Sequence, residues 1–218
     1  MMPMGQREEL VAIARSQIGY QEGPNNTTKY GAWYGMNLQP WCDIFISWCA
    51  GQADLLTIIP KNAYVPNRMA YYQAKGAFRP WGAYTPRPGD LVLFDFNANG
   101  TADHDGIVAE VRGNILYSIE GNTTPNGESG NGGGVYLKNR SLNSNRIVGY
   151  CLPAYKEDDA MNIKTIEVRN LDSNKLIAVE AVNIEGSNYV KLRDTEKLFP
   201  VTIGWDGQNP TLKFNYNE

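Results

Sequence analysis

The sequence predicts an α+β fold in which helices come first and an antiparallel sheet follows. The residues that follow Pro40, up to residue 50, are mostly apolar around the whole circumference of a helix, which is typical of a helix buried in a core. From residue 88 onward, short apolar runs alternate with polar turns, which indicates strands. Residues 6–20 predict an amphipathic helix, because apolar side chains recur at helical spacing at Leu10, Ile13, Ala14 and Ile18. Helices and strands that are segregated along a chain are typical of α+β proteins.

The helical half is expected to contain a loop, a buried helix and a short third helix. Residues 22–39 form the loop, which is rich in Gly, Asn, Thr and Tyr. Pro40 suits the entry of the buried helix, because its missing N–H would have no intrahelical partner there. Residues 51–88 are expected to be irregular around a helix at 67–75 that ends at Gly76. Within this stretch, residues 58–59 and 64–65 are expected to be extended, because a proline follows each pair.

The second half predicts a meander of antiparallel strands. The Pro88-Gly89-Asp90 turn precedes the first apolar run, and a polar loop at 97–101 returns the chain into the second. His104 is expected to enter the core at the head of the second strand. The strands themselves are predicted at 91–96, 106–111, 115–123, 135–140 and 146–151.

A cysteine on the first turn of the buried helix indicates nucleophilic chemistry. Free backbone N–H groups and the positive end of the helix dipole would stabilise a Cys42 thiolate. The base would be His104, the one histidine in the chain. Glu120 and Asn122 are two residues apart and are expected on one strand face, where either could orient the imidazole.

Four sequence blocks, at residues 41–49, 88–94, 104–108 and 119–123, occur in an order that resembles the CHAP domain. This is the cysteine, histidine-dependent amidohydrolase/peptidase family, and the resemblance covers roughly residues 6 to 155. It implies a papain-like fold and the cleavage of amide bonds in bacterial peptidoglycan. Carried over to this chain, Cys42 is the nucleophile, His104 the general base and Glu120 the residue that orients it, with Asn122 as an alternative or additional partner.

The chain is expected to hold two domains: a catalytic one at 1–155, a charged linker at 156–160 and a small α+β domain at 161–218. The last segment resembles the copper amine oxidase N-terminal-like domain through residues 189–194 and 204–207. Copper is not expected, because no His, Cys or Met follows Met161. From Lys156 onward there are eight basic and eleven acidic residues, so charge alone would not attach this domain to anionic wall polymers. Cell-wall binding is the first interpretation, and docking or homodimerisation is the alternative.

The sequence also predicts residues that stabilise an oxyanion and residues that contact the substrate. The Cys42 backbone N–H and Gln39 are expected to stabilise an oxyanion. Aromatic faces suit sugar rings and peptides, so substrate contacts are expected at Trp33, Tyr34, Trp41 and Trp205. No cofactor is expected. No metal site is expected either, since the loop at 22–39 offers one carboxylate, Glu22, where calcium prefers several.

Composition narrows the function further. The 218-residue chain has a net charge of −3, which gives no sign of nucleic-acid binding, and no apolar run long enough to span a membrane. No secretory signal is seen at the N-terminus, so the protein is expected in the host bacterial cytoplasm before release onto the wall. The expected function is peptidoglycan hydrolysis, as the amidase or endopeptidase of a phage endolysin. The alternatives are a secreted amidase effector or autolysin, and a non-catalytic wall-binding protein with this fold.

Overall fold

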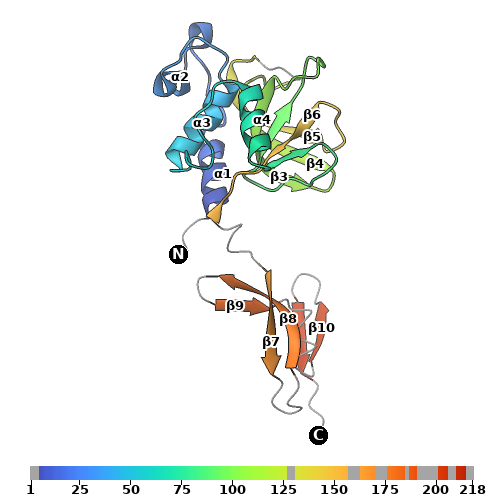
Figure 1. Ribbon diagram of the computed structural model, residues 1–218. Coiled ribbons are helices and arrows are strands. Elements are labelled where there is room, and N and C mark those ends of the chain that lie inside the picture. Colours follow the sequence, from blue (N-terminus) through green and yellow to red (C-terminus); the bar gives the residue numbers. More distant parts are fainter. Residues whose placement is uncertain are drawn as a thin grey trace. The chain divides into compact units, whose positions relative to one another are not determined.

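A computed structural model describes residues 5–126 and 131–156 with their side chains. Beyond them it describes the backbone of strands at 163–169, 176–184, 187–190, 201–205 and 210–214. The chain divides into two compact units, Met1–Tyr155 and Lys156–Glu218. Each unit is described separately (Figure 1).

The first unit begins with its helices. Helix α3 has the low amphipathicity that the sequence predicts, and eight of its residues are buried. It packs against the sheet at β3 and β4, whereas α1 packs against α3 and β3. The helices are α1 (Gln6–Ser16), the single turn η1 (Pro24–Asn26), α2 (Lys29–Tyr34), α3 (Cys42–Gln52) and α4 (Val65–Ala74).

A six-stranded antiparallel sheet follows, with its strands in the order β1-β6-β2-β3-β4-β5. Its strands are β1 (Phe78–Pro80), β2 (Leu91–Phe94), β3 (His104–Arg112), β4 (Ile115–Thr123), β5 (Gly134–Ser141) and β6 (Ile147–Cys151). The last strand of the unit, β6, pairs with β2, so the chain returns to the middle of the sheet. Strands β3, β4 and β5 form the meander predicted from the sequence.

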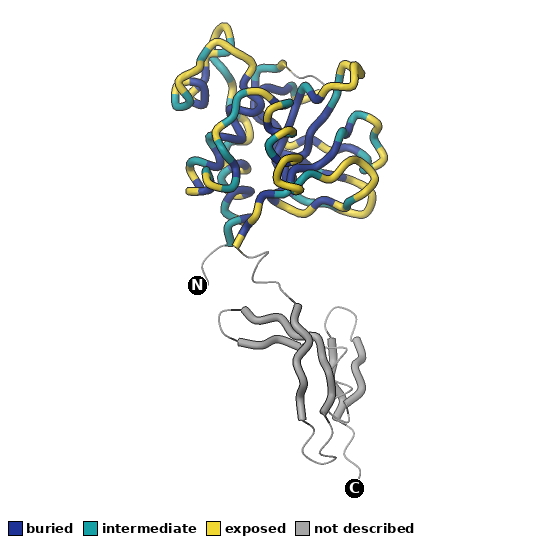
Figure 2. Tube along the Cα trace, viewed as in Figure 1, coloured by how far each residue is buried: buried dark blue, intermediate teal, exposed yellow. Residues whose placement is uncertain are grey.

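The sheet is buried on both faces. Leu91 and Leu93 of β2 face the main core beneath the helices, whereas Val92 and Phe94 face a second, smaller apolar cluster. The alternation follows from the two-residue repeat of a strand. Figure 2 shows the central strands and α3 as buried segments, with exposed residues concentrated in the connecting loops.

Three parts of the secondary structure differ from the sequence prediction. The loop predicted at 22–39 contains α2, whose first turn is stabilised because the Thr28 side chain accepts a hydrogen bond from the Gly31 N–H. Helix α4 begins at Val65 and not at Asn67, because Pro66 occupies a first-turn position where proline is tolerated. The short edge strand β1 pairs with β6 although its sequence shows no clear alternation.

The second unit is described only by its strands. Strands β7 (Ile163–Arg169), β8 (Leu176–Ile184) and β9 (Ser187–Val190) form one antiparallel sheet. Strands β10 (Val201–Trp205) and β11 (Pro210–Phe214) form an antiparallel hairpin. The side chain of Trp205 lies outside the described residues. In the described part of the chain, no helix has the length and apolar character needed to cross a membrane.

Candidate active site

Cys42 is the first residue of α3, where the sequence places it. Its side chain is 6% exposed. The other two cysteines, Cys49 and Cys151, are fully buried, and all three are free thiols. Cys42 is therefore the cysteine that a small reagent or a substrate can reach.

The pKa of the Cys42 thiol is raised well above its usual range. Burial is the main cause, and the negative charges of Asp105 and then Asp43 add to it. Hydrogen bonding from the backbone at Asp43 and Cys42 acts in the opposite direction but is outweighed. The helix N-terminus alone therefore does not produce a thiolate in this site, and a base must remove the proton.

His104 is the first residue of β3 and is fully buried, as the sequence predicts. Its Nε2 lies 3.2 Å from Oε2 of Glu120 on the neighbouring strand β4. Within the described residues, its Nδ1 is buried and has no hydrogen-bond partner. An Nε2–H donated to Glu120 leaves the Nδ1 lone pair available as an acceptor for a proton.

Glu120 is held by partners from three strands. Besides His104 of β3, the Ser118 hydroxyl donates to Oε1 over 2.5 Å, and Arg140 of β5 contacts both carboxylate oxygens. Burial would raise the pKa of Glu120, but the hydrogen bond and charge of His104, together with Arg140, lower it to about 2. Glu120 is thus a fixed anion that selects one orientation of the imidazole.

Two phenylalanine rings support this arrangement from the side. The imidazole of His104 stacks at 5.3 Å on Phe96 and at 6.1 Å on Phe94, measured between ring centroids. The Arg140 guanidinium lies 4.4 Å from the Phe94 ring centre, so the same rings flank both partners of Glu120. The stack restricts rotation of the imidazole and keeps water from the ion pairs.

Asn122 is also buried, but the strand is irregular around it. The pairing of β4 with β5 shifts register between Glu120 and Thr123, and Asn122 has a left-handed backbone conformation with a φ of 56°. The simple alternation that would put Asn122 on the same face as Glu120 is interrupted there. The direct contact with His104 is made by Glu120.

A cleft of about 460 Å³ opens beside the candidate nucleophile. Both Cys42 and Gln39 line it, and so does Asp103, the residue directly before His104. One wall is mainly apolar, with Met36, Ala63, Tyr64, Val65 and Pro66. Such a cleft, apolar with a few polar groups at one end, is typical of a binding site.

The aromatic residues predicted to touch substrate lie elsewhere. Trp41 is 1% exposed and packs in the core, where its indole N–H donates to Glu22. The rings of Trp33 and Tyr34 pack around the Lys61 ammonium. None of these three is among the residues that line the cleft in the described part of the chain. The exposed Tyr64 and Met36 occupy that place instead.

Among the residues that the structure describes, no cluster of three or more His, Cys, Asp or Glu side chains has the arrangement to hold a metal ion. Glu22, the carboxylate considered for calcium, accepts the hydrogen bond from Trp41 at 2.6 Å.

Several residues of the site were not identified from the sequence. Arg140 and Ser118 bind Glu120, and Phe94 and Phe96 flank the imidazole. Ser118 lies two residues before Glu120, so strand periodicity could have placed it on the same face. The position of Arg140 depends on how β5 pairs with β4, which no local pattern reveals.

Comparisons with known proteins give a family match and a structural match. A search of curated proteins finds no match. Among solved structures, the one titled "The crystal structure of Ly7917" aligns over 94% of this chain and 91% of its own at 16% identity, with a TM-score of 0.44. The model of the CHAP domain family matches residues 33–122, a range that contains Cys42, His104 and Glu120. This match covers less than half of the chain and supports a CHAP-domain peptidoglycan hydrolase.

Proposed function

We propose that this protein hydrolyses an amide bond of bacterial peptidoglycan with Cys42 as the nucleophile. The observation that carries the proposal is the buried contact between His104 Nε2 and Glu120, which leaves Nδ1 as the basic nitrogen. Cys42 opens onto a cleft beside the residue that precedes His104. A nucleophile, a base and a group that orients the base are the parts that acyl transfer requires.

The reaction would proceed through an acyl-enzyme. His104 Nδ1 takes the proton of the Cys42 thiol, and the thiolate attacks the amide carbonyl carbon while the C=O electron pair moves to the oxygen. The Cys42 backbone N–H and Gln39 would stabilise that oxyanion. The tetrahedral intermediate collapses, the C–N bond breaks, and His104 gives its proton to the leaving amine. A water activated by His104 then releases the acyl group from sulfur.

The same residues would serve an N-acetylmuramoyl-L-alanine amidase or a peptidoglycan endopeptidase. In either case, we propose that the enzyme reaches the wall from the host cytoplasm, as a phage endolysin does. We propose that Asn122 is a second residue that orients the base.

The test is digestion of a panel of purified bacterial cell walls by wild type and Cys42→Ala, with mass spectrometry of the released fragments. Cys49→Ala is the matched control, because Cys49 lies on the same helix but is fully buried. We expect fragments from wild type and from the control only, and their new termini identify the bond. Release of the same fragments by Cys42→Ala would refute cysteine catalysis.

A non-catalytic wall-binding protein is the rival function, and the raised pKa of the Cys42 thiol favours it. The two functions differ in the reactivity of that thiol. Alkylation of Cys42 that depends on His104, measured with wild type and His104→Ala, supports the enzyme. A thiol that is equally unreactive in both variants supports the binding protein.

A further inference from the structure

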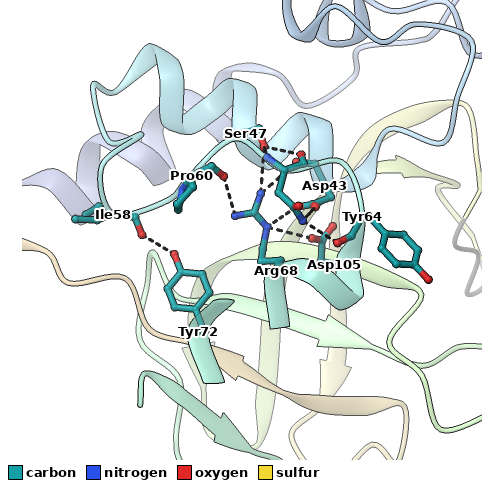
Figure 3. Close-up of polar contacts among 9 residues, drawn as sticks. Asp43, Ser47, Ile58, Pro60, Tyr64, Arg68, Tyr72 and Asp105 are labelled. Carbon is teal, nitrogen blue, oxygen red and sulfur yellow. Dashed lines mark hydrogen bonds and ion pairs between the residues drawn. The ribbon is translucent and has the colours of Figure 1, made fainter. Parts of the chain in front are cut away.

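A buried charge cluster includes Asp43, the residue directly after the candidate nucleophile on α3 (Figure 3). It joins three elements, because Asp43 comes from α3, Arg68 from α4 and Asp105 from β3, and each is at most 2% exposed. Buried charges are costly unless they are paired. The one cation, Arg68, has two carboxylates near it, so its pairing determines which of the two carboxylates can stay ionised.

Arg68 is committed to Asp43. Its Nε donates to Oδ1 of Asp43, and its Nη2 donates to the Ser47 hydroxyl over 3.1 Å. The second oxygen of Asp43 accepts a hydrogen bond from the side-chain amide of Asn62. Asp43 therefore has a partner for both oxygens, and its charge is balanced by the guanidinium.

Asp105 has no comparable partners. Its side chain is fully buried, and its nearest cation is Arg68, whose Nε lies 3.8 Å from Oδ2. Within the described residues, neither of its oxygens has a hydrogen-bond partner at normal geometry. A carboxylate in this position is stabilised by a guanidinium that already neutralises Asp43, and by the neighbouring Cys42 thiol.

The Cys42 thiol is exposed to the same buried charges as Asp105. Among the charged groups that act on the thiol, Asp105 has the largest effect, ahead of Asp43. Burial and then Asp43 raise the pKa of Asp105 itself well above its usual range, and Arg68 and a side-chain hydrogen bond with the Cys42 thiol oppose them. A thiolate at Cys42 and a carboxylate at Asp105 would thus be two unbalanced anions in one buried space.

We propose that Asp105 is a positioning residue that acts through Cys42. The Asp105 carboxylate and the Cys42 thiolate are both anions, and the buried space beside Arg68 accommodates only one of them in its charged form. A protonated Asp105 permits the thiolate, and an ionised Asp105 keeps the thiol protonated. In the alkylation experiment, the proton that leaves the thiol goes to solvent. The proposal rests on the proposed role of Cys42 as nucleophile, but its test reads the ionisation of the thiol directly.

The other ionisable groups around this space do not remove the competition. The negative charge of Glu120 is balanced by its contacts with His104 on β3 and Arg140 on β5. Burial raises the pKa of Cys151 on β6 and of Tyr72 on α4, so both stay neutral near pH 7. The groups around Cys42 and Asp105 are thus Asp43 from α3, Arg68 and Tyr72 from α4 and Cys151 from β6. His104, Glu120 and Arg140 gather beside Phe94 and Phe96 on the other face of the sheet.

The experiment is the rate of iodoacetamide alkylation of Cys42 in the full chain from pH 5 to 10, for wild type, Asp105→Asn and Asp105→Leu. Cys42→Ala provides the background from the buried cysteines. Glu110→Gln is the matched control, because it removes a carboxylate from the same strand at a site where Glu110 pairs with Arg112 near the surface. Loss of a nearby like charge shifts a pKa by roughly one unit or more. We expect both Asp105 variants to move the alkylation midpoint to lower pH, and to raise the rate at least about tenfold at a pH below both midpoints.

Two results would overturn the proposal. One is an alkylation midpoint in both Asp105 variants that equals that of wild type and Glu110→Gln. The other is failure of both variants to fold, because a carboxylate that only restrains the thiol contributes little to stability, and Asp105→Leu keeps the Arg68–Asp43 pair intact. Absence of wall cleavage by wild type would refute the proposed function alone, because the alkylation midpoints do not depend on it.

Discussion

Glu120 connects the candidate base to the rest of the sheet through three strands. Its partners His104, Ser118 and Arg140 lie on β3, β4 and β5, and all four side chains are buried. A buried ion pair of this kind fixes geometry more than it adds stability, and the removal of one partner leaves the other charge uncompensated. Glu120 is therefore the residue at which a single change affects both the orientation of the base and the fold.

Glu120→Gln is expected to lower wall hydrolysis by roughly 10²–10⁴-fold, because the amide can no longer stabilise an imidazolium or select one tautomer. It also leaves the Arg140 guanidinium buried without its counter-charge, which costs about 3–5 kcal/mol of unfolding free energy. Fragment release and urea unfolding measure the two effects. A variant with wild-type activity would contradict the role of Glu120, and Glu110→Gln controls for the loss of a carboxylate.

The lowered pKa of Glu120 also predicts how stability depends on pH. The folded-state pKa is about 2, below the value of 4.5 for an unperturbed glutamate. The unfolded chain therefore binds this proton first, so the stabilisation is complete above about pH 4.5 and is lost as the pH falls towards 2. We expect the melting temperature of wild type to fall more steeply than that of Glu120→Gln over this interval in calorimetry. Parallel curves would contradict the prediction.

At the scale of elements, the position of Cys42 depends on how closely α3 approaches β4. The contact is made at Gly121, where a Cβ atom would lie 2.7 Å from Cβ of Phe45 and 2.8 Å from the Trp41 ring. No side chain fits there without displacing the start of α3 or the strand. The glycine next to Glu120 thus lets the helix that carries the nucleophile lie directly on the strand that orients the base.

Gly121→Ala is expected to destabilise the protein by about 1–3 kcal/mol, the usual cost of overpacking a core. It should also reduce the alkylation rate or the activity, because Cys42 moves with the first turn of α3. Gly133→Ala is the control, since its nearest neighbour would be an atom of Glu22 at 3.7 Å, an ordinary contact. Chemical unfolding of both variants provides the measurement, and equal stabilities would show that α3 is not clamped at Gly121.

At the scale of the whole molecule, the chain consists of two compact units, and the candidate site belongs entirely to the first. The core of Met1–Tyr155 is built from its own helices and strands, and Tyr155 closes it by donating its hydroxyl to the Gly89 carbonyl over 2.6 Å. The first unit should therefore fold without residues 157–218. The second unit is proposed to bind the cell wall, with docking or dimerisation as its alternative role.

A chain that ends at Lys156 is expected to keep the melting transition of the first unit and the alkylation rate of Cys42, but to sediment less with purified walls. The reason is that tethering raises the local concentration of the enzyme at its substrate. Sedimentation with walls, calorimetry and analytical ultracentrifugation separate the alternatives. Unchanged wall binding together with a loss of dimers would refute the wall-binding role and favour dimerisation.

The amino-acid sequence by itself determined the order and type of the main elements. The buried helix, the meander and the positions of Cys42 and His104 at the starts of α3 and β3 follow from local periodicity and turn residues. The sequence was less informative where a local signal was weak, as in α2, or ambiguous, as at Pro66, where the same residue fits an extended segment or the first turn of a helix.

Only the tertiary structure decided which partners surround the site. Arg140 reaches Glu120 because β5 lies beside β4, and Arg68 reaches Asp43 and Asp105 because α4 lies against the start of α3. It also decided that Trp41 is a core residue and that burial raises the pKa of the Cys42 thiol against the effect of its helix N-terminus. Periodicity specifies which face of an element is buried, whereas the charges that meet in the core depend on which elements are neighbours.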